Sequence, residues 1–234
     1  MIAIFKREFK SFFTTPVGYI FLAIMTCFEG WFFSFMYRYG SADISYVFNN
    51  CFIFVFFLIP VLTMRTMSED RRQKVDQVLI TSPISLYSIV FGKFFATLAI
   101  FLLSYSITFV FQIIIAFQNV SINWLIYIGN VLGIVLMGSA LIALGVFISS
   151  LTENQLVSAV GSFTISFIIY MLDYLASIIN LNFVTKIVEY ISFTGRYKTF
   201  VSGILDYSNA VFFIGFAAIF LFLTVRVLDK RRYS

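Results

Sequence analysis

The chain has 234 residues, of which 61% are hydrophobic and only 12% are charged, and its mean hydropathy is +0.97. No water-soluble domain of this length can bury so much apolar surface, so the composition excludes a soluble globular protein and predicts an integral membrane protein. The net charge of +5 does not indicate a nucleic-acid partner, because a membrane protein needs basic loops to set its orientation in the bilayer.

The first predicted element is an amphipathic helix over residues 1–16. Apolar side chains alternate there with charged ones at roughly helical spacing. The charged residues are Lys6, Arg7, Glu8 and Lys10. Such a segment lies in the membrane interface, with its apolar face in lipid and its cations toward anionic headgroups. It acts either as an anchor for the span that follows or as a contact for a cytoplasmic partner, and both interpretations stay open.

Six later stretches are long and apolar enough to cross a bilayer as helices, since a span needs about 20 residues. We expect these spans at residues 17–37, 46–64, 94–117, 124–149, 155–179 and 208–228. If the N-terminus is inside, the inner segments hold twelve of the 16 Lys and Arg residues and the outer segments hold four. Because basic residues resist translocation in short loops, this bias predicts that both termini are cytoplasmic.

Two acidic residues fall inside predicted spans, where a charge is costly and therefore marks a candidate functional site. Glu29 lies more than half way along the first span, and Asp173 lies toward the outer end of the fifth. We expect them on a translocation path or in helix pairing, whereas a shifted first span would put Glu29 near the headgroups. Two isolated acids argue against a secondary transporter, which gathers such groups on broken helices in repeated halves.

The predicted inner loop over residues 65–93 is rich in charge and carries its own helical pattern. An amphipathic stretch after the charged run is broken at Pro83, which disfavours helix at the residue before it. Ser82 or Ser85 then caps a second short helix over residues 86–92, which leads into the third span. The loop is therefore predicted to form a compact helix-proline-helix knob.

Small residues in the fourth span predict close helix packing. Gly129, Gly133 and Gly138 let neighbouring helices approach when burial from water cannot drive their association. They favour packing within the bundle, with a dimer interface as the alternative.

The outer segment over residues 180–207 is too apolar for a free loop. Non-helical backbone at membrane depth needs protein or water partners. We therefore expect two short re-entrant helices that dip into the outer leaflet near a turn at Gly195. Simple packing at the interface is the alternative.

Several kinds of catalytic site are missing from the sequence. No His occurs, which excludes a Ser-His-Asp triad and the HExxH metalloprotease pattern. No G-x-x-x-x-G-K-[ST] phosphate loop occurs either, because Phe94 follows Gly92 and Lys93. We therefore expect that the chain is not an enzyme, holds no metal or cofactor of its own, and does not itself hydrolyse ATP.

Four runs around the charged loop form a distinctive pattern: Pro-Val-Leu-Thr-Met-Arg at 60–65, Glu-Asp-Arg-Arg-Gln at 69–73, Leu-Ile-Thr-Ser-Pro-Ile-Ser at 79–85 and Ile-Val-Phe-Gly-Lys at 89–93. Further runs are Arg-Glu-Phe-Lys at 7–10, Ser-Leu-Thr-Glu-Asn-Gln at 150–155 and Gly-Ile-Leu-Asp at 203–206. Together they resemble the permease subunits of ABC-2 type ABC transporters, and most closely the gliding-motility type of permease.

The resemblance implies a half-transporter in the bacterial inner membrane. Two permease copies, identical or related, would work with two cytoplasmic ATP-binding subunits that bind ATP and Mg²⁺. The resemblance also implies a single permease domain over residues 1–234, with the loop at 65–93 acting as the coupling helix that the ATPase receives. The contact residues carried over by motif are Glu69, Asp70, Arg71, Arg72, Gln73, Asp76, Thr81, Ser82 and Pro83. Many relatives have Gly-Thr where Lys74 and Val75 stand and Glu where Gln77 stands, which leaves the individual salt partners open.

The sequence therefore predicts an all-α membrane protein with the six-helix bundle of ABC-2 type permeases, an N-terminal interfacial helix, a cytoplasmic coupling helix and outer re-entrant helices. The predicted function is that of a permease in an ATP-driven transporter, with export expected from the resemblance alone. The alternative is a membrane scaffold or immunity-type interaction protein that uses the same bundle without moving a solute.

Overall fold

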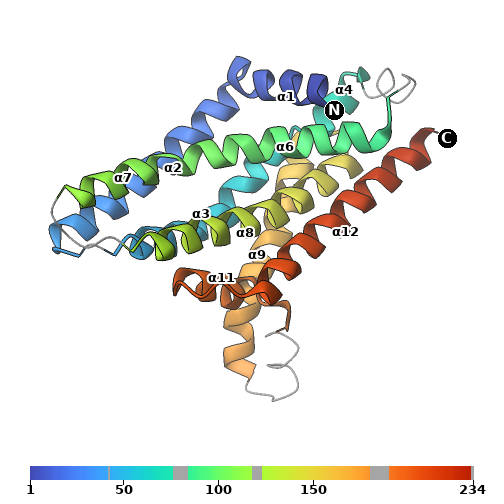
Figure 1. The fold of residues 1–234 in the computed structure, drawn as a ribbon. Coiled ribbons are helices and arrows are strands. Elements are labelled where there is room, and N and C mark those ends of the chain that lie inside the picture. The colour runs from blue at the N-terminus through green and yellow to red at the C-terminus, as the bar shows by residue number, and fades with distance from the viewer. Residues whose placement is uncertain (42, 76–83, 118–122, 180–189, 233–234) are drawn as a thin grey trace.

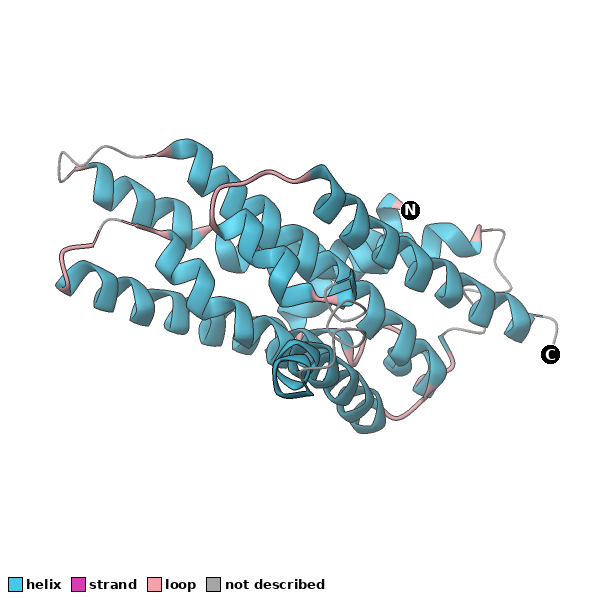
Figure 2. Ribbon diagram, turned by 90° about the horizontal axis from the view of Figure 1, so that it is seen from below, coloured by secondary structure: helices cyan, strands magenta, loops and turns pink. Residues whose placement is uncertain are grey.

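The structure is a computed structural model that describes residues 1–41, 43–75, 84–117, 123–179 and 190–232, without the side chains of residues 173 and 175–179. Within these residues every regular element is a helix (Figures 1 and 2). The helices are α1 (Ile2–Thr14), α2 (Pro16–Arg38), α3 (Ser45–Thr63), α4 (Ser68–Arg72), α6 (Leu86–Tyr105), α7 (Ile107–Ala116), α8 (Trp124–Leu151), α9 (Gln155–Ile179), α11 (Phe193–Val201) and α12 (Tyr207–Arg232).

Six stretches of the described chain are long and apolar enough to cross a membrane. They are Pro16–Arg38, Ser45–Arg72, Leu86–Ala116, Trp124–Leu151, Gln155–Leu172 and Tyr207–Arg232. The predicted all-helical, six-span fold class is therefore confirmed. Five of the six predicted spans begin within one residue of the observed helix, and the third is the exception.

The third span begins at Leu86, eight residues earlier than predicted. Ser85 is the N-cap of α6, and its hydroxyl accepts a hydrogen bond of 3.3 Å from the backbone N–H of Ser88. The separate short helix predicted over residues 86–92 is wrong, because these residues form the first turns of one continuous helix. Gly92 does not break α6. Instead, it gives room to α1, since a Cβ atom at Gly92 would lie 3.0 Å from a methyl carbon of Ile4.

Helix α8 is the centre of the bundle and packs against α3, α6, α9, α11 and α12. Its glycines make these approaches close. A Cβ atom at Gly133 would lie 2.5 Å from the Phe200 side chain of α11, and one at Gly138 would lie 2.3 Å from Phe101 of α6. A Cβ atom at Gly129 would lie 3.2 Å from the carbonyl oxygen of Phe200. All three predicted glycines therefore make contacts within the chain.

The predicted outer segment at 180–207 is described only from residue 190 onward. Helix α11 runs through Gly195, whose backbone N–H donates a 2.7 Å hydrogen bond to the Ser192 side chain at the N-cap. The turn predicted at Gly195 is therefore wrong, because a capped first helical turn occupies that position. Residues 180–189, where the other short helix was expected, lie outside the described residues.

Both chain ends lie at the same end of the bundle, together with α1, α4, the start of α6 and the last turn of α8 (Figure 1). We call this the terminal end. Helix α11 lies away from it, near the start of α12. The terminal end contains most of the charged contacts within the described part of the chain.

Candidate functional site: a charged network at the terminal end

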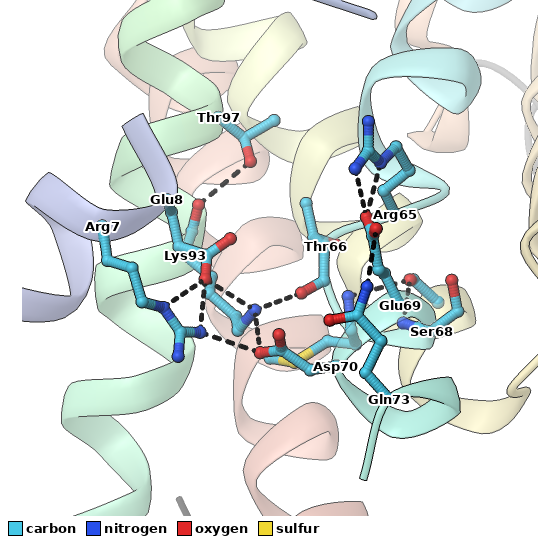
Figure 3. A network of polar contacts seen from close by, with 12 residues as sticks. Arg7, Glu8, Arg65, Thr66, Ser68, Glu69, Asp70, Gln73, Lys93 and Thr97 are labelled. Atoms are coloured by element: carbon cyan, nitrogen blue, oxygen red, sulfur yellow. Dashed lines mark hydrogen bonds and ion pairs between the residues drawn. The ribbon is translucent and has the colours of Figure 1, made fainter. Parts of the chain in front are cut away.

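Lys93 of α6 is the centre of a charged network (Figure 3). Its side chain is only 1% exposed, and its Nζ lies 3.1 Å from Oε1 of Glu8 and 2.6 Å from Oδ2 of Asp70. The same ammonium group donates a hydrogen bond to the backbone carbonyl of Thr66. A buried ammonium group is tolerated only when it is paired and hydrogen-bonded, and Lys93 meets both conditions.

Arg7 joins the two carboxylates from the outside of the network. One guanidinium nitrogen lies 2.6 Å from Glu8 and 2.9 Å from Asp70. Burial lowers the pKa of Arg7, but the hydrogen bond to Glu8 and the charge of Asp70 outweigh it, so the pKa lies above its usual value. Two cations and two anions therefore connect α1, α4 and α6 in a balanced cluster (Figure 3).

The apolar face of α1 holds the network in place. Ile4 and Phe12 are buried, and glycines on the neighbouring helices let α1 lie against them. Gly92 of α6 meets Ile4, and a Cβ atom at Gly18 of α2 would lie 2.4 Å from the backbone oxygen of Phe12. The amphipathic helix predicted at the N-terminus thus packs on the bundle with its apolar face, while Arg7 and Glu8 point to α4 and α6.

A second set of contacts fixes α4 to the last turn of α8. The Ser149 hydroxyl accepts 3.1 Å hydrogen bonds from the backbone N–H groups of Met67 and Ser68. Arg71 lies 2.8 Å from the carboxylate of Glu153 and donates a 3.1 Å hydrogen bond to the carbonyl oxygen of Leu151. The short charged helix is therefore attached on both sides, to α1 and α6 by Asp70 and to α8 by Arg71.

A polar cavity of about 300 Å³ lies between α1 and the chain at 65–75. Charged and polar side chains from both segments line it, among them Arg7, Arg65 and Glu69. Arg65 pairs with Glu69 through an Nε to Oε2 distance of 2.6 Å, and the Gln73 side chain donates a 3.1 Å hydrogen bond to the same carboxylate. The cavity is therefore walled by paired charges.

The predicted contact residues separate into two groups in the structure. Glu69, Asp70 and Arg71 are partly buried and pair within the chain, whereas Arg72 and Gln73 are exposed. Arg72 forms no ion pair with any residue that the structure describes. Asp76, Thr81, Ser82 and Pro83 lie outside the described residues.

Sequence reasoning missed the part played by three residues. The predicted loop over residues 65–93 ends at Lys93 and so places it in water, although its position next to Gly92 at the start of an apolar run favours burial. Ser149 has no sequence signal of its own, and Glu153 belongs to the run at 150–155 that carries the resemblance, but nothing in either pattern shows that α4 lies against them. Of the N-terminal charges, Arg7 and Glu8 enter the network, while Lys6 and Lys10 are exposed.

A second candidate site lies inside α2. Glu29 is on the face of α2 that includes buried Met25, and its side chain is 0% exposed. Neither carboxyl oxygen has a hydrogen-bond partner among the described residues. Cys51 and Tyr105 lie close enough to interact with it electrostatically. The side chain of Asp173, the other predicted acid, is not among those that the structure describes.

Comparison with known proteins gives one family. The model of the ABC-2 family transporter protein matches residues 33–227, a region that includes α4, Lys93, four complete spans and most of α12 but leaves out α1 and most of α2. No curated protein matches the chain. Since the match covers well over half of the sequence and the structure supplies six apolar helices, the chain is a multi-pass membrane protein that belongs to the ABC-2 family of transporter proteins.

Proposed function

We propose that this chain is the permease subunit of an ATP-driven ABC-2 exporter and that force from a separate ATP-binding subunit enters the bundle through α4. The observation that carries this proposal is the network around Lys93, which ties α4 to α1 and α6. A load applied to α4 reaches three helices at once, because buried ion pairs and the Ser149 hydrogen bonds resist its sliding.

The energy source is expected outside this chain. The sequence contains no phosphate loop, and members of the family generally pair with an ATP-binding subunit. That subunit would bind ATP and Mg²⁺, and two copies would act with two permease copies. The whole chain, 1–234, then serves as one permease domain in a bacterial inner membrane, and we place it with the gliding-motility type of permease.

The terminal end is proposed to face the cytoplasm, where the ATP-binding subunit would dock. The support is the bias of Lys and Arg toward the segments at this end. Arg72 and Gln73 are exposed there, next to the paired residues of α4, and Asp76, Thr81, Ser82 and Pro83 continue the same proposed contact. Docking and force transfer thus use different residues of one segment.

The proposed division between docking residues and force-transferring residues can be tested by substituting one residue of each kind. If a reading frame adjacent to this gene encodes a Walker A phosphate loop, its product is expressed together with the chain, and both assembly and ATPase activity are measured. Arg72→Glu should weaken co-purification, because it reverses an exposed charge at the contact. Arg7→Gln should leave co-purification intact but lower the ATPase activity that the permease stimulates, because it loosens α1 from α4.

The matched control is Lys198→Glu, an exposed charge on α11, away from the terminal end. This variant should behave like the wild type in both measurements. If Arg72→Glu and Arg7→Gln also behave like the wild type, α4 is not the coupling element. A chain that carries out its task without any ATP-hydrolysing partner would favour the scaffold alternative.

A further inference from the structure

An apolar groove of about 390 Å³ lies on the outside of the bundle, where α6, α8 and α12 pack against one another. It runs along α6 from Tyr87 to Leu98 and along α12 from Ile214 to Val225. The hydroxyl of Ser139, on the α8 side, donates its hydrogen bond to the carbonyl oxygen of Leu136 at 2.7 Å. The groove surface is therefore suited to a hydrocarbon chain.

The length of the groove matches one leaflet of a bilayer. Each wall covers eleven helical steps, from Tyr87 to Leu98 and from Ile214 to Val225, and at 1.5 Å per residue this gives about 16 Å. Half of a hydrocarbon core of about 30 Å is about 15 Å. A chain lying in the groove would therefore extend from the headgroup level to the middle of the membrane.

Basic side chains stand at one end of the groove, the terminal end. Arg226 follows the last lining residue of α12, and its guanidinium carbon lies 5.0 Å from the ring centroid of Phe222, which lines the groove. Lys230 is exposed one helical turn further on. Neither cation forms an ion pair with a residue in the described ranges. Tyr87, 53% exposed, stands at the same end, at the level where aromatic residues meet headgroups.

We propose that this groove is a binding site for an anionic phospholipid, with one acyl chain in the groove and the phosphate against Arg226 and Lys230. Charge and length together favour this occupant, since basic sites next to apolar channels at the membrane surface recognise anionic headgroups. A second copy of the chain would have to supply an acid against Arg226. The site goes beyond the transport function and does not depend on α4.

Selectivity for an anionic headgroup is tested on the purified full-length protein in detergent. Native mass spectrometry compares the binding of phosphatidylglycerol and phosphatidylcholine with identical acyl chains. The wild type should retain phosphatidylglycerol preferentially. Arg226→Gln should bind it about fivefold more weakly, as expected for the loss of one basic residue near an anionic group, and Arg226→Gln with Lys230→Gln about 25-fold more weakly. Lys198→Gln, which removes the same charge from an exposed position on α11, away from the terminal end, should bind like the wild type.

A free phosphate is distinguished from a lipid by competition. Inorganic phosphate should not displace phosphatidylglycerol, because it lacks the acyl chain that fills the groove. Displacement by phosphate, or equal retention of phosphatidylglycerol by the wild type and by Arg226→Gln, would overturn the proposal.

The groove itself is tested with Ala218→Phe, which fills it from an exposed position on α12. This variant should lose phosphatidylglycerol and phosphatidylcholine alike. If it changes the oligomeric state and keeps its lipid, a second copy occupies the groove and the lipid proposal is wrong. If it does not purify as a single species, the comparison of Arg226→Gln with Lys198→Gln still tests whether the headgroup binds at Arg226.

Discussion

Two ionisable side chains are buried in the same helix bundle with opposite surroundings. Lys93 is 1% exposed and has two carboxylates and a backbone carbonyl as partners, whereas Glu29 is 0% exposed and has no hydrogen-bond partner among the described residues. The difference follows from location. At the terminal end, α1 and α4 bring acceptors to Lys93, while Glu29 faces regular helices whose backbone groups are already paired.

This comparison separates an ionisable residue with a structural role, Lys93, from a candidate functional one, Glu29. Breaking a network such as that of Lys93 leaves its partners without compensation, so its loss is expected to be costly. An unpartnered acid contributes no such ion pair, so its removal is expected to cost little stability. The free energy of unfolding should therefore respond very differently to the two neutralising substitutions.

The largest expected effect is that of Lys93→Met, which keeps the length of the side chain and removes its charge. Glu8 and Asp70 would then face each other with only Arg7 between them. Removing one partner of a buried pair costs about 3–5 kcal/mol, and we expect about 3 kcal/mol because these carboxylates are 13% and 17% exposed. The midpoint of thermal unfolding in detergent should fall, and hydrogen exchange should increase in α1 and α4.

The control for this prediction is a second substitution within the network. Adding Asp70→Asn to Lys93→Met should recover part of the lost stability, because it removes one of the two carboxylates left without their cation. Lys198→Met, an exposed lysine on α11, should change the unfolding midpoint little. Equal destabilisation by Lys93→Met and Lys198→Met would show that the network contributes nothing.

The sequence predicted one of these two residues much better than the other. Glu29 was recognisable because an acid within 20 apolar residues is costly wherever the bundle packs. The partners of Lys93 are Glu8, 85 residues before it, and Asp70 in the charged loop. The packing of α1 on Gly92 brings Glu8 to Lys93, and the attachment of α4 to α8 holds Asp70 there. Hydropathy therefore predicted the spans and the amphipathic α1, while the pairing of charges required the tertiary structure.

The same limit applies at Gly195. A glycine in an apolar segment favours a turn, but the Ser192 side chain caps a helix there. Lys74, in contrast, stands where the family pattern has glycine, and this difference has a local explanation. Lys74 follows the end of α4 with a φ of 58°, a left-handed conformation that glycine adopts without strain. This conformation accounts for the glycine that many relatives are expected to have at this position.

A smaller effect is expected from Lys74→Gly, because Lys74 directly follows α4, the helix that holds Asp70 against Lys93. The left-handed conformation costs a residue with a side chain roughly 1 kcal/mol, so the substitution should raise the free energy of unfolding by about that amount. Lys74→Ala removes the same charge and keeps the backbone strain, so it should give no gain. A rise in the unfolding midpoint for both variants would instead assign the effect to the charge.

The smallest expected effect is that of Glu29→Gln, although Glu29 is the more deeply buried residue. An ionised carboxylate without donors is costly in a low-dielectric interior, so the group is expected to carry a proton, and glutamine keeps its shape without the charge. The free energy of unfolding should change by less than about 1 kcal/mol. Infrared spectra of the wild type should contain the carbonyl stretch of a protonated carboxyl group, and Glu29→Gln should lack it. Carboxylate bands that disappear in this variant would mean that Glu29 is ionised and has a partner inside the bundle, and the contrast with Lys93 would then be lost.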